Sequence, residues 1–163
     1  MRAGCIFIAV SFLAASTSLA TEPTSKTVIG PANLDLAAGA DALRFGDYEE
    51  GIKLTLRGLE QHPSERDRSA ALSNLCAGYA ATDQYDLAIK HCSDSLEINE
   101  RNWHAYHNRA AAHLYQGNYD EAIEDAQAGL ALNPRSRKLR RALEVAEEKK
   151  RELYTPRVVI EEH

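Results

Sequence analysis

The sequence predicts an all-α protein in which three helix–turn–helix units are followed by one further helix. Three observations support this prediction. Aromatic residues make up only 7% of the 163 residues, and alanine is abundant, which favours closely packed helices over sheets. A pattern of residues recurs at a spacing of 34 residues. Within each copy, apolar residues follow two helical stripes, one on each side of a turn.

Residues 1–20 have the composition of a secretory signal. Arg2 precedes an uncharged apolar run, residues 5–15, and the small residues Ser18 and Ala20 stand where a signal peptidase requires them. We therefore expect cleavage after Ala20, export to the periplasm or the extracellular space, and no inserted membrane segment in the mature chain. An uncleaved N-terminal anchor is the alternative, although the run is shorter than the ~20 residues that span a bilayer.

The repeated pattern is clearest at the turns between helices. Tyr119 follows Tyr85 by 34 residues. An earlier copy has Tyr48 at the corresponding place, 37 residues before Tyr85, so three residues are inserted between the first two copies. The insertion is placed most simply among residues 64–68. The three units are residues 32–65, 69–102 and 103–136.

Each unit has small residues where its two helices must cross. In the third unit these are Ala110 on the first helix and Ala122 on the second. Larger side chains at such places would hold the helix axes beyond the ~8–10 Å of packed helices. The full set is Gly39, Gly51, Cys76, Ala88, Ala110 and Ala122.

A last amphipathic helix is expected over residues 137–153, because a stack of repeats needs a terminal helix with one polar face. The stretch 135–151 has eight basic and three acidic residues. This charge is either a solvated face or a surface that attracts an acidic partner or anionic lipid. Residues 21–31 predict a flexible leader. Residues 154–163 predict a frayed tail, whose run 157–160 could instead add to a partner.

No group of residues has the spacing of a catalytic or metal site. His104 and His107 are three residues apart, but zinc requires three or four ligands. There is no Gly-rich phosphate loop, and no nucleophile can be paired with a base. A net charge of −5 argues against nucleic-acid binding. We expect a protein that is not an enzyme and that binds no cofactor, metal ion or nucleic acid.

Two cysteines, Cys76 and Cys92, remain after the expected cleavage, one on each helix of the second unit. The repeat pattern sets Cys76 opposite Ala88, and Cys92 lies one turn further along, a rise of ~5.4 Å. Added to the gap between the helices, this rise exceeds the separation that a disulfide tolerates. Two buried thiols are therefore the favoured prediction, and a disulfide is the alternative.

The three units resemble the tetratricopeptide repeat, a 34-residue helix–turn–helix motif with characteristic small, aromatic and proline positions. The third unit is the best match, through Tyr106, Ala110, Gly117, Tyr119, Ala122, Ala126 and Pro134. It departs from the pattern at Arg109, which stands where the family usually has leucine. The resemblance covers residues 32–136 and implies a right-handed α-solenoid of three repeats with the C-terminal helix as its cap.

The resemblance also implies a concave groove along the first helices, which takes peptide or protein segments in this family. The residues expected to line it are Asn74, His104, His107, Asn108, Leu114, Tyr115, Lys138 and Arg141. Asn74 and Asn108 would bind peptide backbone through one donor and one acceptor each, unless they only lie on a solvated face. Leu114 and Tyr115 would anchor an apolar side chain.

The phrase over residues 106–110 is similar to that of a chaperone-binding subgroup that holds a C-terminal carboxylate. The subgroup's set is incomplete here, because Ser73 and Ala77 stand where it has Lys and Asn. The sequence thus predicts an exported scaffold that binds a protein or peptide segment in its groove. An accessory subunit of a cell-envelope enzyme complex is the alternative function.

Overall fold

The computed structural model describes residues 33–154, which form seven α-helices. The helices are α1 (Leu34–Phe45), α2 (Tyr48–Leu59), α3 (Glu65–Ala81), α4 (Tyr85–Ile98), α5 (Trp103–Gln116), α6 (Tyr119–Leu132) and α7 (Arg137–Tyr154). The predicted signal segment (1–20), the leader (21–31) and positions 155–163 of the predicted tail lie outside the described residues.

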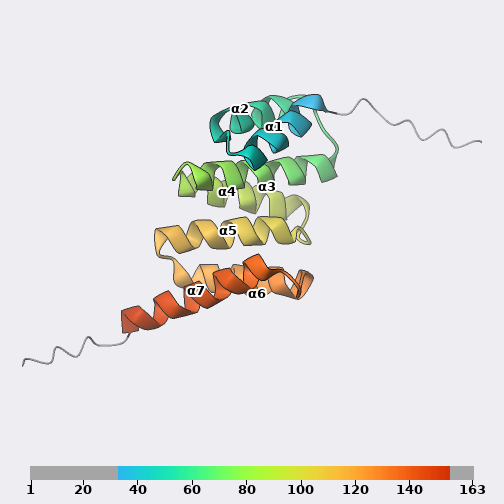
Figure 1. Cartoon of the computed structure of the whole chain (residues 1–163). Coiled ribbons are helices and arrows are strands. Elements are labelled where there is room, and N and C mark those ends of the chain that lie inside the picture. The colour runs from blue at the N-terminus through green and yellow to red at the C-terminus, as the bar shows by residue number, and fades with distance from the viewer. Residues whose placement is uncertain (1–32, 155–163) are drawn as a thin grey trace, which may run out of the picture. The chain divides into compact units, whose positions relative to one another are not determined.

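The helices pack as successive pairs. α1 packs on α2, α3 on α4 and α5 on α6, and α7 covers α6. Figure 1 shows these pairs stacked in chain order, from α1 and α2 at one end to α7 at the other. The first helices α1, α3, α5 and α7 also contact one another in succession. This arrangement confirms the predicted three helix–turn–helix units with a C-terminal capping helix.

The turn inside each unit has a residue in the left-handed region. Gly46 ends α1 with a φ of 87°, and Gly117 ends α5 with a φ of 81°. The second unit has Asp83 at the same place, with a φ of 59°. Asp is tolerated there because short polar side chains stabilise this conformation through local hydrogen bonds. The Asp83 carboxylate accepts a hydrogen bond of 2.5 Å from the Tyr85 hydroxyl.

The predicted small residues lie at the helix crossings. Ala88, Ala110 and Ala122 have no exposed surface. At Gly39, an added Cβ atom would lie only 2.5 Å from the Thr55 hydroxyl oxygen. The backbones of α1 and α2 therefore approach too closely for any side chain there, which confirms the packing prediction.

The prediction of two free thiols is wrong, because a disulfide joins Cys76 and Cys92, whose Cα atoms are 5.3 Å apart. Both residues are completely buried. The prediction added the rise of one turn to the gap between the helices. In the first unit, however, an added Cβ on Gly39, the equivalent of Cys76, would lie close to both Gly51 and Thr55. A residue at this crossing therefore lies between two residues one turn apart, so Cys76 reaches Cys92 directly.

The insertion between the first two units lengthens a helix. α3 has 17 residues, against 12 in α1 and 14 in α5. Its first turn begins at Glu65, within the stretch where the sequence places the extra residues. Ser64 caps this turn by accepting a hydrogen bond of 3.2 Å from the Asp67 amide. The extra residues are thus helical from the cap onward.

Candidate binding groove

Three cavities follow one another along the stack, each between two neighbouring helices of the series α1, α3, α5 and α7. The first, between α1 and α3, has a volume of about 380 Å³. The second, between α3 and α5, has about 290 Å³, and the third, between α5 and α7, has about 500 Å³. Asn74 lines both the first and the second cavity. We call this series the binding groove.

All eight residues predicted for the groove line one of two successive cavities. Asn74, His104 and Asn108 line the α3–α5 cavity. The α5–α7 cavity is lined by the other five, which are His107, Leu114, Tyr115, Lys138 and Arg141. Sequence reasoning did not include Tyr119, Val145 and Lys149, which also line the α5–α7 cavity. The last two lie one and two helical turns after Arg141 on the same face of α7, which is the signal that could have found them.

The two groove asparagines differ in their hydrogen bonds. Asn108 Nδ2 donates a hydrogen bond of 3.0 Å to the Ser73 carbonyl on α3. Its Oδ1 lies 3.0 Å from His107 Nδ1, which must donate because an amide oxygen only accepts. Asn108 therefore lines the groove and also joins α5 to α3. Asn74 is half-buried and has no hydrogen-bond partner among the described residues.

The α5–α7 cavity has a positive rim. Lys138 makes no ion pair with any described residue. Arg141 lies 3.7 Å from Glu144, and Lys149 lies 2.8 Å from Glu152, both in exposed pairs. Exposed pairs of this kind contribute little to stability, so both cations can exchange their partners for a ligand carboxylate.

The groove histidines are neutral at pH 7. Burial lowers the pKa of His104, and the neighbouring His107 and Lys138 lower it further. Burial also lowers the pKa of His107, against the opposing effect of its hydrogen bond to Asn108. His91 and His113, outside the groove, have pKa values lowered by burial as well. Within residues 33–154, no group of three or more His, Cys, Asp or Glu residues could hold a metal ion.

Tyr115 is an exposed aromatic side chain in a fixed position. It is 72% exposed, yet its ring stacks on Tyr85 with the centroids 5.5 Å apart and the planes 10° from parallel. Tyr85 belongs to the second unit and Tyr115 to the third, so the stack spans two units. A side chain held in this way loses little conformational entropy when a ligand binds.

An ion pair behind the groove was missed by sequence reasoning. Arg109 donates to both carboxylate oxygens of Asp125, at 2.8 and 2.7 Å, and to Ser93 Oγ at 2.8 Å. Asp125 is only 5% exposed, and its hydrogen bond raises the pKa of Arg109. The pair joins α4, α5 and α6. Arginine in a leucine position was the available signal, because a buried guanidinium requires an acid opposite it.

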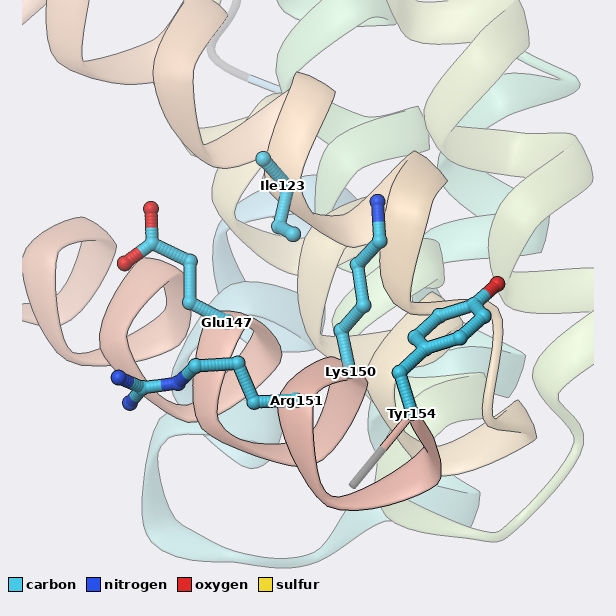
Figure 2. Close-up of a pocket in the computed structure, with 5 residues that line it drawn as sticks. All are labelled: Ile123, Glu147, Lys150, Arg151 and Tyr154. Atoms are coloured by element: carbon cyan, nitrogen blue, oxygen red, sulfur yellow. The ribbon is translucent and has the colours of Figure 1, made fainter. Parts of the chain in front are cut away.

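A separate cavity of about 570 Å³ lies between α6 and α7. Figure 2 shows Ile123 of α6 between two groups of α7 side chains, with Glu147 and Arg151 on one side and Lys150 and Tyr154 on the other. Lys150 is paired with Asp120. No residue predicted for the groove lines this cavity.

Among the helices that the structure describes, none is both long and apolar enough to cross a lipid bilayer.

The sequence is similar to a known repeat family and to known proteins that contain such repeats. Residues 104–136 match the family described as tetratricopeptide repeat. The chain is 26% identical over 113 residues to DnaJ homolog subfamily C member 3 of Rattus norvegicus, which covers 69% of this chain and 22% of that protein. The chain thus spans about a fifth of the length of this relative.

Solved structures with the same fold include the Sgt2 TPR domain from Aspergillus fumigatus. Its TM-score is 0.70 at 21% identity, over 82% of this chain and 91% of that one. The second TPR domain of human RPAP3, solved in complex with the HSP70 peptide SGPTIEEVD, has a TM-score of 0.62 at 21% identity, over 69% of this chain and 92% of that one.

The family match lies in the unit that the sequence identified as the clearest copy. Residues 104–136 therefore match a tetratricopeptide repeat, and the described chain has the fold of tetratricopeptide-repeat domains, with three helix–turn–helix repeats and a capping helix.

Proposed function

We propose that this protein is exported and that it binds a peptide segment of another protein along the binding groove. The observation that carries the proposal is the α5–α7 cavity, which combines an apolar wall with a positive rim. Leu114, Tyr115 and Val145 provide the wall, and Lys138 and Arg141 provide the rim. The peptide bound to the second TPR domain of human RPAP3 is a precedent for such a ligand in this fold.

The chemistry of the groove favours a segment with one apolar anchor and nearby carboxylates. Burial of a side chain the size of leucine contributes about 1.5–3 kcal/mol. Asn74 offers a free carboxamide to the peptide backbone further along the groove, worth about 0.5–1.5 kcal/mol per hydrogen bond. The neutral His104 and His107 add no charge of their own, so the attraction for an acid comes from α7.

Export is supported by the buried disulfide between Cys76 and Cys92. Structural disulfides persist in oxidising compartments and are rare in the cytosol. We expect the mature protein, isolated from the envelope or the medium, to begin at Thr21. Intact-mass measurement or N-terminal sequencing checks this expectation, and soluble exported protein that still carries Met1 would contradict it.

Site-specific crosslinking tests the binding face. A photoreactive amino acid replaces Tyr115 in one variant and Leu87 in a control variant. Leu87 is also exposed but lies on α4 and lines none of the three cavities. We expect a protein adduct from position 115 that disappears when Lys138→Glu and Arg141→Glu are added, and no adduct from position 87. Equal adducts from both positions would move the binding face away from the groove.

A further inference from the structure

The sequence that follows α7 has the chemistry of a ligand for the α5–α7 cavity. Residues 155–163 read Thr-Pro-Arg-Val-Val-Ile-Glu-Glu-His, with three branched apolar residues followed by two acids. The cavity has an apolar wall next to three cations, Lys138, Arg141 and Lys149. We propose that residues 155–163 bind in the α5–α7 cavity of their own chain and compete there with the partner, an inference that rests on the proposed function.

The reach of the segment fits this cavity. α7 rises about 1.5 Å per residue, so Val145 lies about 14 Å and Lys138 about 24 Å back along the helix from Tyr154. An extended chain advances about 3.4 Å per residue. If the segment runs back along α7, position 158 arrives beside Val145 after about 14 Å, and positions 161 and 162 arrive beside Lys138 after about 24–27 Å. The apolar residues then meet the apolar wall, and the two acids meet the cations.

The sequence at the junction favours such a reversal. Pro156 lacks the amide hydrogen of a helix and disfavours helical geometry at Thr155, so a helix ends at or before that residue. The described helix ends at Tyr154. The chain can therefore change direction directly after α7.

Charge distinguishes this cavity from the one between α6 and α7. The α6–α7 cavity is lined by a carboxylate, Glu147, and its Lys150 is already paired with Asp120. Its lining extends only from position 147 to position 154 of α7, about 11 Å of helix, so the acids at 161 and 162 would pass beyond it. Lys138, in contrast, has no ion-pair partner in the described part of the chain.

Tethering makes even weak binding effective. A segment joined by a short flexible link has an effective concentration in the millimolar range. Suppose that residues 155–163, as a free peptide, bind the empty cavity with a dissociation constant of about 100 µM. The tethered segment would then occupy the cavity in about nine-tenths of the molecules, and the free peptide would have to displace it. The full chain should bind that peptide about tenfold more weakly than a chain without the segment.

Fluorescence anisotropy with a labelled synthetic peptide of residues 155–163 tests the proposal. The peptide is titrated with the full chain, with a variant that ends at Tyr154, and with the full chain carrying Glu161→Lys and Glu162→Lys. We expect the second and third proteins to bind the peptide at least about tenfold more tightly than the first. In the shortened chain, Lys138→Glu with Arg141→Glu should abolish binding. The control Arg137→Glu with Arg140→Glu makes the same charge change on exposed residues of α7 that line neither the α5–α7 nor the α6–α7 cavity, and should leave binding intact.

Several results would overturn the inference. Equal affinity of the peptide for the full and shortened chains, or no binding to the shortened chain, shows that the segment is not an internal ligand. Dimerisation that is lost with the segment, measured by light scattering over a range of concentrations, shows exchange between copies instead. If the peptide fails while position 115 still crosslinks a partner, the inference falls and the proposed function stands. If the photoreactive residue at position 115 of the otherwise unchanged full chain gives no adduct with a partner, the proposed function itself is refuted.

Discussion

The disulfide between α3 and α4 gives the sharpest prediction about stability. We consider the double variant Cys76→Ala with Cys92→Ala. The third unit provides an internal precedent, because Ala110 and Ala126 occupy the equivalent positions and are completely buried. Two alanines therefore pack acceptably at this crossing, and the principal loss in the variant is the covalent link.

The size of the effect follows from the length of the closed loop. The two cysteines are 16 residues apart, and closure of a loop of about 15 residues contributes about 3 kcal/mol by restricting the unfolded chain. In a domain of this size, 1 kcal/mol corresponds to about 4 °C in Tm. We expect the variant to melt about 12 °C below the wild-type protein.

Circular dichroism melts with and without dithiothreitol provide the assay. Reductant should lower the Tm of the wild-type protein toward that of the variant, and it should leave the variant unchanged. Thiol titration of the denatured, unreduced wild-type protein should find no free Cys76 or Cys92. Two titratable thiols, or a wild-type Tm that is insensitive to reductant, would refute the reasoning.

Three further predictions concern packing, pH and the groove. Ala122→Leu should overpack the α5–α6 crossing and cost about 1–3 kcal/mol, so a melt equal to the wild type would show that the register is wrong. The four histidines with lowered pKa resist protonation in the folded protein, whereas the unfolded chain takes up protons near the ordinary value of 6.5. The free energy of unfolding should therefore be highest above about pH 6.5 and should decrease as the pH is lowered from 7.5 to 5.5. Urea titrations at several pH values measure this, and a free energy that stays constant or increases as the pH is lowered would contradict it. Asn108→Ala should lower stability by about 0.5–1.5 kcal/mol, because the hydrogen bond that joins α5 to the Ser73 carbonyl of α3 is lost. Asn74→Ala should leave stability unchanged and weaken crosslinking at position 115, and equal melts for the two variants would refute this difference.

The sequence predicted the helices well because the repeat pattern specifies their crossings directly. Gly39 and Ala122 are small for a reason that holds in any member of such a stack, since the backbones approach closely there. The period fixed which helix follows which, and the positions of the turns followed from the recurring tyrosines. None of this required knowledge of individual side-chain contacts.

The errors arose where side-chain contacts decide the outcome. The disulfide was rejected because the argument added the rise of one helical turn to the gap between the two helices. In the structure, a residue at the crossing lies between two residues of the facing helix, so it can reach either of them. The hydrogen bond of Asn108 to Ser73 was not predicted, because it joins residues 35 positions apart. Arg109 looked like a departure from the repeat pattern, because its partner Asp125 is recognisable only once α5 and α6 are placed side by side.

The links between helices are unevenly distributed along the stack. The disulfide joins α3 to α4, and Arg109 joins α4, α5 and α6. Among residues 33–154, neither kind of link joins the α1–α2 pair to the other helices. Because repeat domains are stabilised by each unit and its neighbours, the first unit should open at a lower free energy than the other two and exchange its amide hydrogens sooner. A long ligand that extends into the α1–α3 cavity must then hold this unit closed, and its affinity is reduced by that cost. A short ligand in the α5–α7 cavity meets a wall that is already in place.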